Sequence, residues 1–353
     1  MKLAFYAPMK PPDHPTPSGD REIARLTLRA LELAGYEVNI VSNLRTLDMA
    51  GSQDAQADLM AKAGVEAEWL VETLSEGPPD AWLSYHCYYK APDLIGPVVS
   101  GALQIPYLIS EPSISPKRRL GEWSRFAFAS EAAIAHADRL LWTTTRDLPE
   151  LQSAGHGGKL VHLPAFLDPG PAVPPRPAGE PLRLLTIAMM RPGAKMESYR
   201  RLAAALDRLE DDWELTVIGG GDGEAAVSAL FADHLSQISF LGTLTDQKII
   251  RTHCERHDLL VWPGVEEGVG MVWLEAQAAG LPIIAEDGPA ARNALGGGRL
   301  TPPEDPDAMA GAIRDAARDR EALSGQARAH IETNHSLEAA AVILHREIEA
   351  LIA

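Results

Sequence analysis

Short apolar runs alternate with longer amphipathic stretches along almost the whole chain, and this alternation limits the fold more than any other feature. Residues 20–34 repeat apolar side chains at helical spacing and end at Gly35, and the apolar run 38–41 follows at once. Strands that alternate with helices form a parallel sheet with helices on both faces. The expected strands are residues 3–7, 38–41, 81–85, 107–110, 139–143 and 160–163, then 183–188, 214–218, 238–241, 259–262 and 281–285.

Residues 168–181 interrupt this alternation with six prolines. Such a composition predicts a semi-rigid linker, and a chain of 353 residues is long for one domain. We therefore expect an α/β protein with two doubly wound domains, each built on a parallel sheet. The expected division is an N-terminal domain at 1–168, a linker at 169–181, a C-terminal domain at 182–335 and a last helix within 336–353.

The formal net charge of −17 argues against nucleic acid as a partner, because phosphate backbones are bound through Lys and Arg. The densest basic run, Lys117-Arg118-Arg119, is either solvated surface or faces an acidic acceptor or a lipid phosphate. We expect no signal peptide, because the apolar start is short and has no small-residue cleavage site, and no apolar run reaches membrane-spanning length. We expect a cytoplasmic protein with at most peripheral membrane contact. Two distant cysteines, Cys87 and Cys254, give neither a disulfide framework nor a metal site.

Residues 266–282 carry the strongest functional signal. Glu267 and Glu275 lie eight positions apart, and a glycine-bearing turn between them leads into an apolar helix. Bare backbone amides at a helix start form a seat for phosphate. Eight helical residues rise about 12 Å, comparable to the reach from a sugar across a diphosphate to a ribose. The alternative is a buried helix with two incidental glutamates, but the order of turn, helix, Gly280-Leu281-Pro282 stop and apolar strand favours a nucleotide-sugar site.

This pattern resembles the Glu-x7-Glu motif of the retaining family-four glycosyltransferases, the glycosyl transferases of group 1. The order and spacing of elements are similar over nearly the whole chain. The resemblance implies a GT-B fold: two Rossmann-like domains that face a central cleft, with a last helix that crosses back to the N-terminal domain. It also implies that Glu275 holds the ribose of the donor. Sugar and phosphate would be held by Glu267 and by the backbone of Gly268, Val269, Gly270 and Met271.

Two cations follow the strand that opens the second domain. Arg191 and Lys195 match the Arg and Lys that bind donor phosphates in the family, although Met196 replaces the usual Gly. Fixed cations stabilise a departing diphosphate without a metal. Taken alone, the loop could equally be a surface loop with two solvated cations.

A glycine-rich turn follows the next strand. Its spacing fails the dinucleotide fingerprint, because the last glycine position falls on Glu224. In the family this turn passes near the donor, which makes Gly219 and Gly220 candidate donor contacts. Thr243 lies in a segment that binds the base largely through backbone, so the sequence does not identify the base.

Three positions of the first domain are candidates for the donor phosphate and the acceptor. Gly19 lies in a turn that matches the N-terminal loop of the family, where Ser18 or Asp20 could also cap a helix. His86 stands at a position where the family often has His, and aromatic neighbours suggest an acceptor pocket. Glu111 stands where many relatives carry His, so it either takes over part of that role or caps the next helix.

The resulting hypothesis is a retaining enzyme that moves a hexosyl group from a nucleoside-diphosphate sugar to a hydroxyl of an unknown acceptor: a cell-surface glycan, a lipid headgroup or a small metabolite. The expected catalytic residues are Arg191, Lys195, Glu267, Glu111 and His86, with no metal and no cofactor besides the donor. The alternatives are another GT-B enzyme, such as a nucleotide-sugar epimerase or hydrolase, and a degenerate nucleotide-sugar-binding partner subunit.

Overall fold

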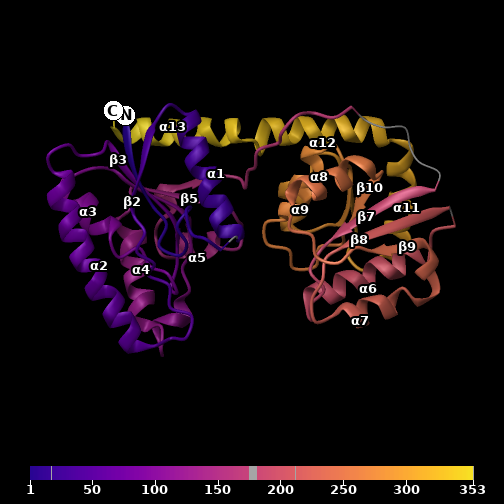
Figure 1. Cartoon of the computed structure of the whole chain (residues 1–353), viewed down its shortest axis with the longest axis horizontal. Helices are drawn as coiled ribbons and strands as arrows, with labels where there is room; N and C mark the ends of the chain where they lie inside the picture. Colours follow the sequence, from indigo (N-terminus) through magenta and orange to yellow (C-terminus); the bar gives the residue numbers. More distant parts are fainter. Residues whose placement is uncertain (17, 175–180, 211, 353) are drawn as a thin grey trace. The chain divides into compact units, whose positions relative to one another are not determined.

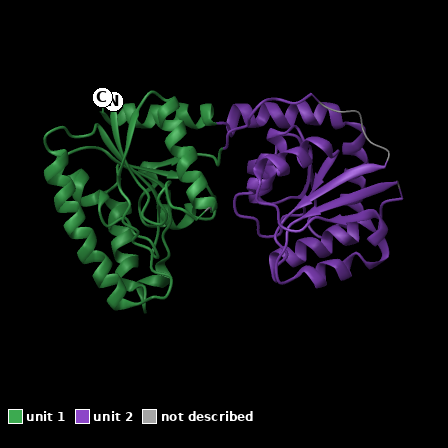
Figure 2. Cartoon of the chain, viewed as in Figure 1, with its two compact units in different colours: residues 1–166, 337–353 green, residues 167–336 purple. Residues whose placement is uncertain are grey.

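The computed structural model describes residues 1–16, 18–174, 181–210 and 212–352. It contains two compact units (Figure 2): unit 1 is residues 1–166 with 337–353, and unit 2 is residues 167–336. Each unit is built on a six-stranded sheet in which every pair of neighbouring strands is parallel. The expected α/β class with two doubly wound domains is confirmed.

The sheet of unit 1 has the order β2-β1-β3-β4-β5-β6. Winding proceeds in opposite directions from β1 and β3, so the loops at their carboxyl ends diverge and leave a crevice where ligands of such sheets bind. All six strands expected in this half of the chain form: β1 (Lys2–Tyr6), β2 (Glu37–Ser42), β3 (Ala81–Cys87), β4 (Tyr107–Pro112), β5 (Arg139–Trp142) and β6 (Leu160–His162).

Helices cover both faces of this sheet (Figure 1). Alternate residues of β1 feed two cores: Leu3 and Phe5 belong to the core of one face, and Ala4 and Tyr6 to that of the other. The first core is closed by α1 (Gly19–Leu33) and α13 (Leu337–Ile352). The second is closed by α2 (Gln53–Leu74), α3 (Gly96–Leu103) and α4 (Ser124–His136); the remaining elements are α5 (Leu148–Ser153) and the short 3-10 helices η1 (Pro116–Arg119) and η2 (Gly157–Lys159).

Polar contacts fix α13 in unit 1 beside its apolar face. The Tyr36 hydroxyl lies 3.0 Å from His345 Nδ1 and donates to Glu349 at 3.2 Å, and Arg139 pairs with Glu347 at 3.1 Å. The last helix of the chain is therefore part of the fold of the N-terminal unit.

Unit 2 has the sheet order β12-β11-β10-β7-β8-β9, which places the switch point between β7 and β10. One face carries α6 (Ala194–Leu206), α7 (Glu224–Leu230) and α11 (Pro306–Arg318), and the other α8 (Gln247–Arg256), α9 (Met271–Ala278) and α12 (Arg320–Asn334) (Figure 1). The strands are β7 (Leu182–Ile187), β8 (Trp213–Ile218), β9 (Ile238–Phe240), β10 (Leu259–Val261), β11 (Ile283–Glu286) and β12 (Gly298–Thr301); α10 (Pro289–Ala294) and the 3-10 helix η3 (Ala232–Gln237) complete the unit.

Strand β12 has no counterpart among the expected strands. It follows a run of glycines and contributes Leu300 as its only large apolar side chain. As an edge strand it pairs with β11 alone and needs no apolar run to be buried on both faces.

The first residues of the expected linker are bonded to unit 2. Arg251 and Arg328 both donate to the carbonyl of Pro169, at 2.7 and 3.0 Å, and Arg328 also donates to that of Gly170 at 2.7 Å. A Cβ on Gly170 would lie 2.6 Å from the Arg251 guanidinium, and the φ of 58° at this position favours glycine. The rest of the expected linker, residues 175–180, lies outside the described residues.

Candidate active site

In unit 2, the expected donor site lies at the carboxyl ends of the central strands. Lys195 begins α6 after β7, and Glu267 lies in the loop between β10 and α9. These two strands are neighbours, so residues 72 positions apart in sequence meet: Lys195 Nζ lies 2.6 Å from Glu267 Oε2. The side chains are 16% and 17% exposed, so solvent screens the pair only partly.

Trp262 completes this pair. Its indole Nε1 donates to the same Oε2 of Glu267 at 3.2 Å, and Lys195 Nζ lies 5.3 Å from the centroid of its ring. Tyr199 packs edge-on against the ring at 5.1 Å and fixes it. Both donors bond to Oε2 of Glu267. The other carboxylate oxygen, Oε1, receives no hydrogen bond from another described residue.

The loop that carries Glu267 contains two glycines that pack against the ring of one tryptophan. Gly264 and Gly270 have φ of 75° and 72°, and a Cβ on either would lie 2.3 Å from the buried ring of Trp273. Glu266 also has a left-handed φ of 52°. Gly270 is the N-cap of α9 and provides no side-chain cap. The amides of Gly268 and Val269 make no backbone hydrogen bond to a described residue, so they are available to an anion at this helix start.

Glu275 lies one helical turn further along α9 and differs from Glu267 in having no partner. It is half-buried, and its carboxylate makes no hydrogen bond or ion pair with another described residue. Burial raises its pKa to about 7. A partly desolvated carboxylate without a partner is costly unless a donor arrives from outside, as two ribose hydroxyls would.

Arg191 is not brought into this cluster. Its side chain is exposed, and it forms no ion pair or hydrogen bond with the other described residues. The structure therefore joins Lys195 to Glu267 and leaves Arg191 on the neighbouring loop surface.

The glycines of the turn after β8 permit close backbone packing. A Cβ on Gly219 would lie 1.8 Å from the carbonyl oxygen of Ala188, and one on Gly221 2.5 Å from that of Met190. The amide of Gly219 donates to the carbonyl of Gly242, and the carbonyl of Gly220 accepts from Met190. Thr243 is exposed beside Gly220, since a Cβ there would lie 2.7 Å from its hydroxyl. A cavity of about 390 Å³ lies alongside, lined by Met190, Gly219, Glu224, Ala225, Ser228, Phe240 and Gly242.

In unit 1, two predicted residues share an unusual backbone conformation at the switch-point edge. His86 near the end of β3 and Glu111 near the end of β4 have φ of 63° and 53°. Left-handed non-glycine residues are uncommon, and they cluster where the surrounding structure fixes side chains for function. The flanking pairs Tyr85–Ser110 and Cys87–Pro112 bring the two positions level in the sheet.

Asp20, in the first turn of α1, reaches His86. Its Oδ1 lies 3.3 Å from His86 Nδ1. The close contact with His86 lowers the pKa of Asp20. Burial lowers the pKa of His86, but Asp20 and Glu111 outweigh it, so the pKa lies above its usual value. Burial raises the pKa of Glu111, and the His86 charge opposes this.

Gly19 begins α1 and is exposed. The Ser18 hydroxyl accepts from the amide of Arg21 at 3.3 Å, so the capping interpretation of this turn is confirmed for Ser18. Neighbouring Pro17 lies outside the described residues.

Several site residues were missed in the sequence. In the sequence, Trp262 and Trp273 have the pattern of ordinary core residues. Nothing in the local sequence indicates that glycines pack against the ring of Trp273 or that a lysine lies over the ring of Trp262. The Asp20–His86 pair joins residues of two separate motifs, and only the sheet order brings them together.

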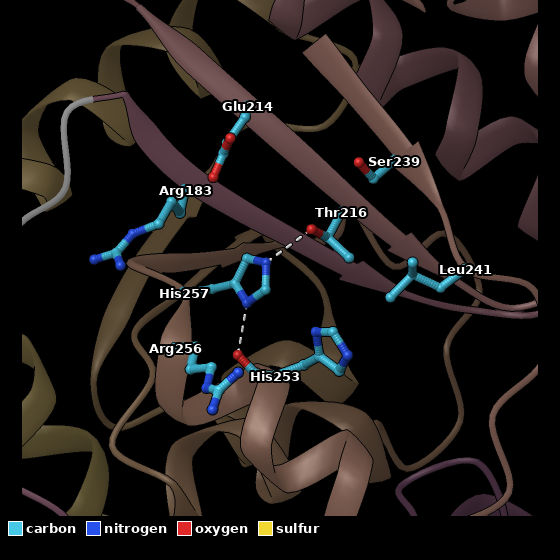
Figure 3. A pocket seen from close by; sticks show the side chains of 8 residues that line it. All are labelled: Arg183, Glu214, Thr216, Ser239, Leu241, His253, Arg256 and His257. Carbon is cyan, nitrogen blue, oxygen red and sulfur yellow. Dashed lines mark hydrogen bonds between the residues drawn. The ribbon is translucent and has the colours of Figure 1, made fainter.

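A second groove of unit 2 contains none of the predicted residues (Figure 3). It has a volume of about 590 Å³ and lies against β8 and β9 beside the end of α8. His257 bonds Thr216 at 2.9 Å and the carbonyl of His253 at 2.6 Å, so its ring is held within the protein. The lining residues are Arg183, Glu214, Thr216, Ser239, Leu241, His253, Arg256 and His257.

Among residues 1–16, 18–174, 181–210 and 212–352, no group of three His, Cys, Asp or Glu side chains could hold a metal ion. Within the same residues, no helix combines the length and the apolarity that a membrane span needs.

Sequence comparison finds relatives of the part of the chain that carries this site. Residues 181–319 match the family described as glycosyl transferases group 1. A GDP-mannose-dependent monoacylated alpha-(1-6)-phosphatidylinositol monomannoside mannosyltransferase of Corynebacterium glutamicum is 31% identical over 139 residues, 36% of each chain. A D-inositol 3-phosphate glycosyltransferase of Geodermatophilus obscurus is 28% identical over 248 residues, 63% of this chain and 53% of the relative. The matches thus span about a third to a half of these curated relatives.

Solved structures match over nearly the full length. HepE of Anabaena, in a crystal structure with UDP, superposes with a TM-score of 0.70 at 14% identity and covers 99% of this chain and 100% of its own. Sucrose-phosphate synthase of Thermosynechococcus elongatus gives 0.68 at 17% identity, over 99% and 98%.

The fold is therefore GT-B, as expected. Residues 181–319, most of unit 2, match the glycosyl transferases of group 1, and the resemblance seen in the sequence is confirmed.

Proposed function

We propose that this protein is a retaining glycosyltransferase that moves a hexosyl group from a nucleoside-diphosphate sugar to a hydroxyl of an acceptor. The observation that carries the proposal is the contrast between the two carboxylates that flank the glycine turn. Glu267 is paired with Lys195, whereas Glu275 is half-buried, unpaired and has a pKa raised to about 7. The free amides of Gly268 and Val269 lie between them. The site therefore combines a cation, Lys195, with amides that can bind an anion and with a carboxylate, Glu275, that can accept hydrogen bonds from hydroxyls.

Each group has a role in the proposed reaction. Glu275 accepts hydrogen bonds from the ribose, and the amides of Gly268 and Val269 bind the diphosphate. Lys195, held by Glu267, stabilises the charge that develops on the diphosphate as the bond from the sugar carbon breaks. Oε1 of Glu267 remains for a sugar hydroxyl. Arg191 is exposed on the neighbouring loop and approaches the phosphates when the donor is bound.

The transfer itself needs no nucleophile from the protein. The acceptor oxygen forms its bond to the sugar carbon on the face from which the diphosphate departs. The acceptor proton passes to an oxygen of the leaving phosphate. His86, Asp20 and Glu111 of unit 1 orient the acceptor hydroxyl.

The relatives support this activity by what their names state: one is a GDP-mannose-dependent mannosyltransferase and another a glycosyltransferase acting with D-inositol 3-phosphate. The HepE structures contain UDP or UDP-glucose. Together they favour a nucleoside-diphosphate hexose as donor. The nucleotide base differs between them, guanine in one name and uracil in the HepE structures.

The test is a calorimetric and thermal-shift screen against UDP, GDP, ADP and their sugar conjugates, with no metal added. A ligand that binds only the folded state raises the melting temperature by mass action. We expect one base to bind and Glu275→Ala to weaken its binding at least tenfold, because the carboxylate bonds to hydroxyls are charge-assisted. Glu321→Ala, an exposed glutamate of α12, is the matched control.

The outcomes separate the alternatives. Unchanged donor affinity in Glu275→Ala would show that the ribose is placed wrongly, and no response to any nucleotide would overturn the donor site. Donor breakdown without an acceptor would indicate a hydrolase. Binding without any turnover would indicate a partner subunit. The anomeric coupling of the product in proton NMR tests retention of configuration.

A further inference from the structure

The basic run of η1 sends its three side chains in different directions. Lys117 is exposed, and Arg119 binds both carboxylate oxygens of Glu131, at 2.9 and 3.0 Å. Arg118 instead folds back over the rings of Tyr89 and Trp123 and lies 5.1 Å from the centroid of each. The run is therefore neither uniformly solvated nor uniformly paired, and only Arg118 is turned onto the aromatic surface.

Lys90 lies over the same two rings. Its Nζ is 5.8 Å from the centroid of Tyr89 and 5.4 Å from that of Trp123, and the two rings meet edge to face with centroids 5.8 Å apart. We call Tyr89, Trp123, Lys90 and Arg118 the cationic platform. Each cation gains from the ring faces, but two like charges beside the same rings repel each other.

Neither cation of the platform has an anionic partner among the described residues. The side chains of Lys90 and Arg118 form no ion pair or hydrogen bond within the described parts of the chain. The Nε of Arg118 is buried without a hydrogen-bond acceptor. A buried donor without an acceptor is costly, and it is expected to find one in a bound molecule or water. In a chain with 49 acidic and 32 basic residues, two neighbouring unpaired cations are unexpected.

The carboxylate of Asp48, a residue whose backbone contacts the platform, is already engaged. It accepts hydrogen bonds from the amides of Ala50 and Gly51 and from the side chain of Gln56. Its backbone supports the platform, because its amide donates to the carbonyl of Lys90 at 2.9 Å and its carbonyl accepts from the Trp123 indole at 3.5 Å. The platform is thus built in advance and keeps its positive charge.

A row of rings connects the platform to the candidate acceptor residues. Tyr89 contacts Tyr88 with centroids 5.5 Å apart, and Tyr88 contacts His86 at 4.8 Å. Lys90 follows β3 and Arg118 follows β4, so both cations lie at the same sheet edge as His86 and Glu111. A molecule with its reactive hydroxyl at His86 would extend along these rings toward Lys90 and Arg118.

We propose that Lys90 and Arg118, held over Tyr89 and Trp123, bind a phosphate group of the acceptor. A planar guanidinium and an ammonium together match the charge and the oxygens of a phosphate. The proposal rests on the proposed function for the transfer, but the binding itself involves unit 1 alone. The phosphate belongs either to a soluble phosphorylated polyol or to the headgroup of a phospholipid.

The test compares phosphorylated and unphosphorylated probes by calorimetry at constant ionic strength, in the absence of nucleotide. Glucose 6-phosphate and myo-inositol 1-phosphate are expected to bind at least tenfold more tightly than glucose and myo-inositol. Vesicles of phosphatidylcholine with and without phosphatidylinositol test the lipid source. Binding of the soluble probes alone, of the phosphatidylinositol vesicles alone, or of both supports the site and names its source.

The variants Arg118→Met and Lys90→Met remove the charge and keep an apolar stem over the rings. Each is expected to weaken the binding of the phosphorylated probe at least tenfold and to leave the binding of the unphosphorylated probe unchanged. Lys117→Met, from the same 3-10 helix, is the matched control and should behave as the parent protein. Thermal unfolding of all three variants verifies that they are folded.

The proposal is overturned if no phosphorylated probe or vesicle binds, if phosphorylation does not alter affinity, or if Lys117→Met weakens binding as much as Arg118→Met. Nucleotide binding is measured on the same protein in a separate titration. Phosphate binding without nucleotide binding would reject the proposed function and keep this site. The reverse would reject this site and keep the function.

Discussion

The carboxyl ends of the two sheets use different chemistry for sites of related function. In unit 2, Lys195 and Glu267 form an ion pair, and the amides of Gly268 and Val269 make no backbone hydrogen bond to a described residue. In unit 1 the edge consists of side chains from four separate segments, with acids and His86 on one side and the cationic platform on the other.

The difference follows from the two proposed ligands. A diphosphate is bound well by bare amides, and these require glycines and a helix start that are contiguous in sequence. An acceptor is bound by side chains that protrude from several loops, and these are brought together only by the fold. The first kind of site is therefore visible as a motif, and the second is not.

The largest expected effect is a loss of catalytic activity on removal of a cation at the edge of unit 2. Lys195→Ala removes the cation beside the departing diphosphate, so kcat should fall about 100- to 1000-fold, as for the loss of one fixed charge-stabilising donor. Steady-state assays with the donor found in the screen measure it. Lys248→Ala, an exposed lysine at the start of α8, should retain full activity. A loss of similar size in both variants would show that general charge, and not the Lys195–Glu267 pair, is responsible.

The next effect tests whether the glycine loop of unit 2 is as constrained as its geometry indicates. Gly270→Ala places a Cβ against Trp273 at a φ of 72°, so the free energy of unfolding should fall by about 3 kcal/mol. Urea denaturation measures it. Gly325→Ala in α12, where a Cβ meets nothing within 4 Å, should stabilise the protein by about 0.5 kcal/mol. Equal effects at both sites would mean that the loop adapts to a side chain.

How far the sequence predicts each edge follows from the same comparison. Glu267, Lys195 and the glycine turn could be predicted because each lies in a short contiguous segment that resembles the family. The position of Arg191 on an exposed loop could not, since two cations four residues apart differ only in how the loop turns. Strand β12 was not predicted, because an edge strand needs little apolar character. The positive φ of His86 and Glu111 carries no local signal, because neither residue is a glycine.

A smaller effect distinguishes the two carboxylates of unit 2. The pKa of Glu275 is raised to about 7, so the folded state binds its proton more tightly than the unfolded state. Stability is then lost as pH rises from the unfolded pKa, near 4.5, to about 7. Glu275→Gln should raise the free energy of unfolding by about 2 kcal/mol at pH 8, which is less than the whole pKa shift converts to because solvent screens the half-buried carboxylate, and have no effect at pH 4. Urea titrations at the two pH values measure it, and a pH-independent difference would reject burial as the cause.

The smallest effect concerns the pair in unit 1. The pKa of His86 is raised, so its contact with Asp20 stabilises the protein at low pH and is lost as pH rises through the folded pKa. Asp20→Asn should therefore lower the pKa of His86 and cost about 0.5 kcal/mol at pH 6, since both side chains are partly exposed. At pH 9 the variant should be as stable as the parent protein. Proton NMR titration of the His86 ring measures the pKa directly. An unchanged pKa would mean that Glu111 and Asp147, and not Asp20, keep the proton on His86.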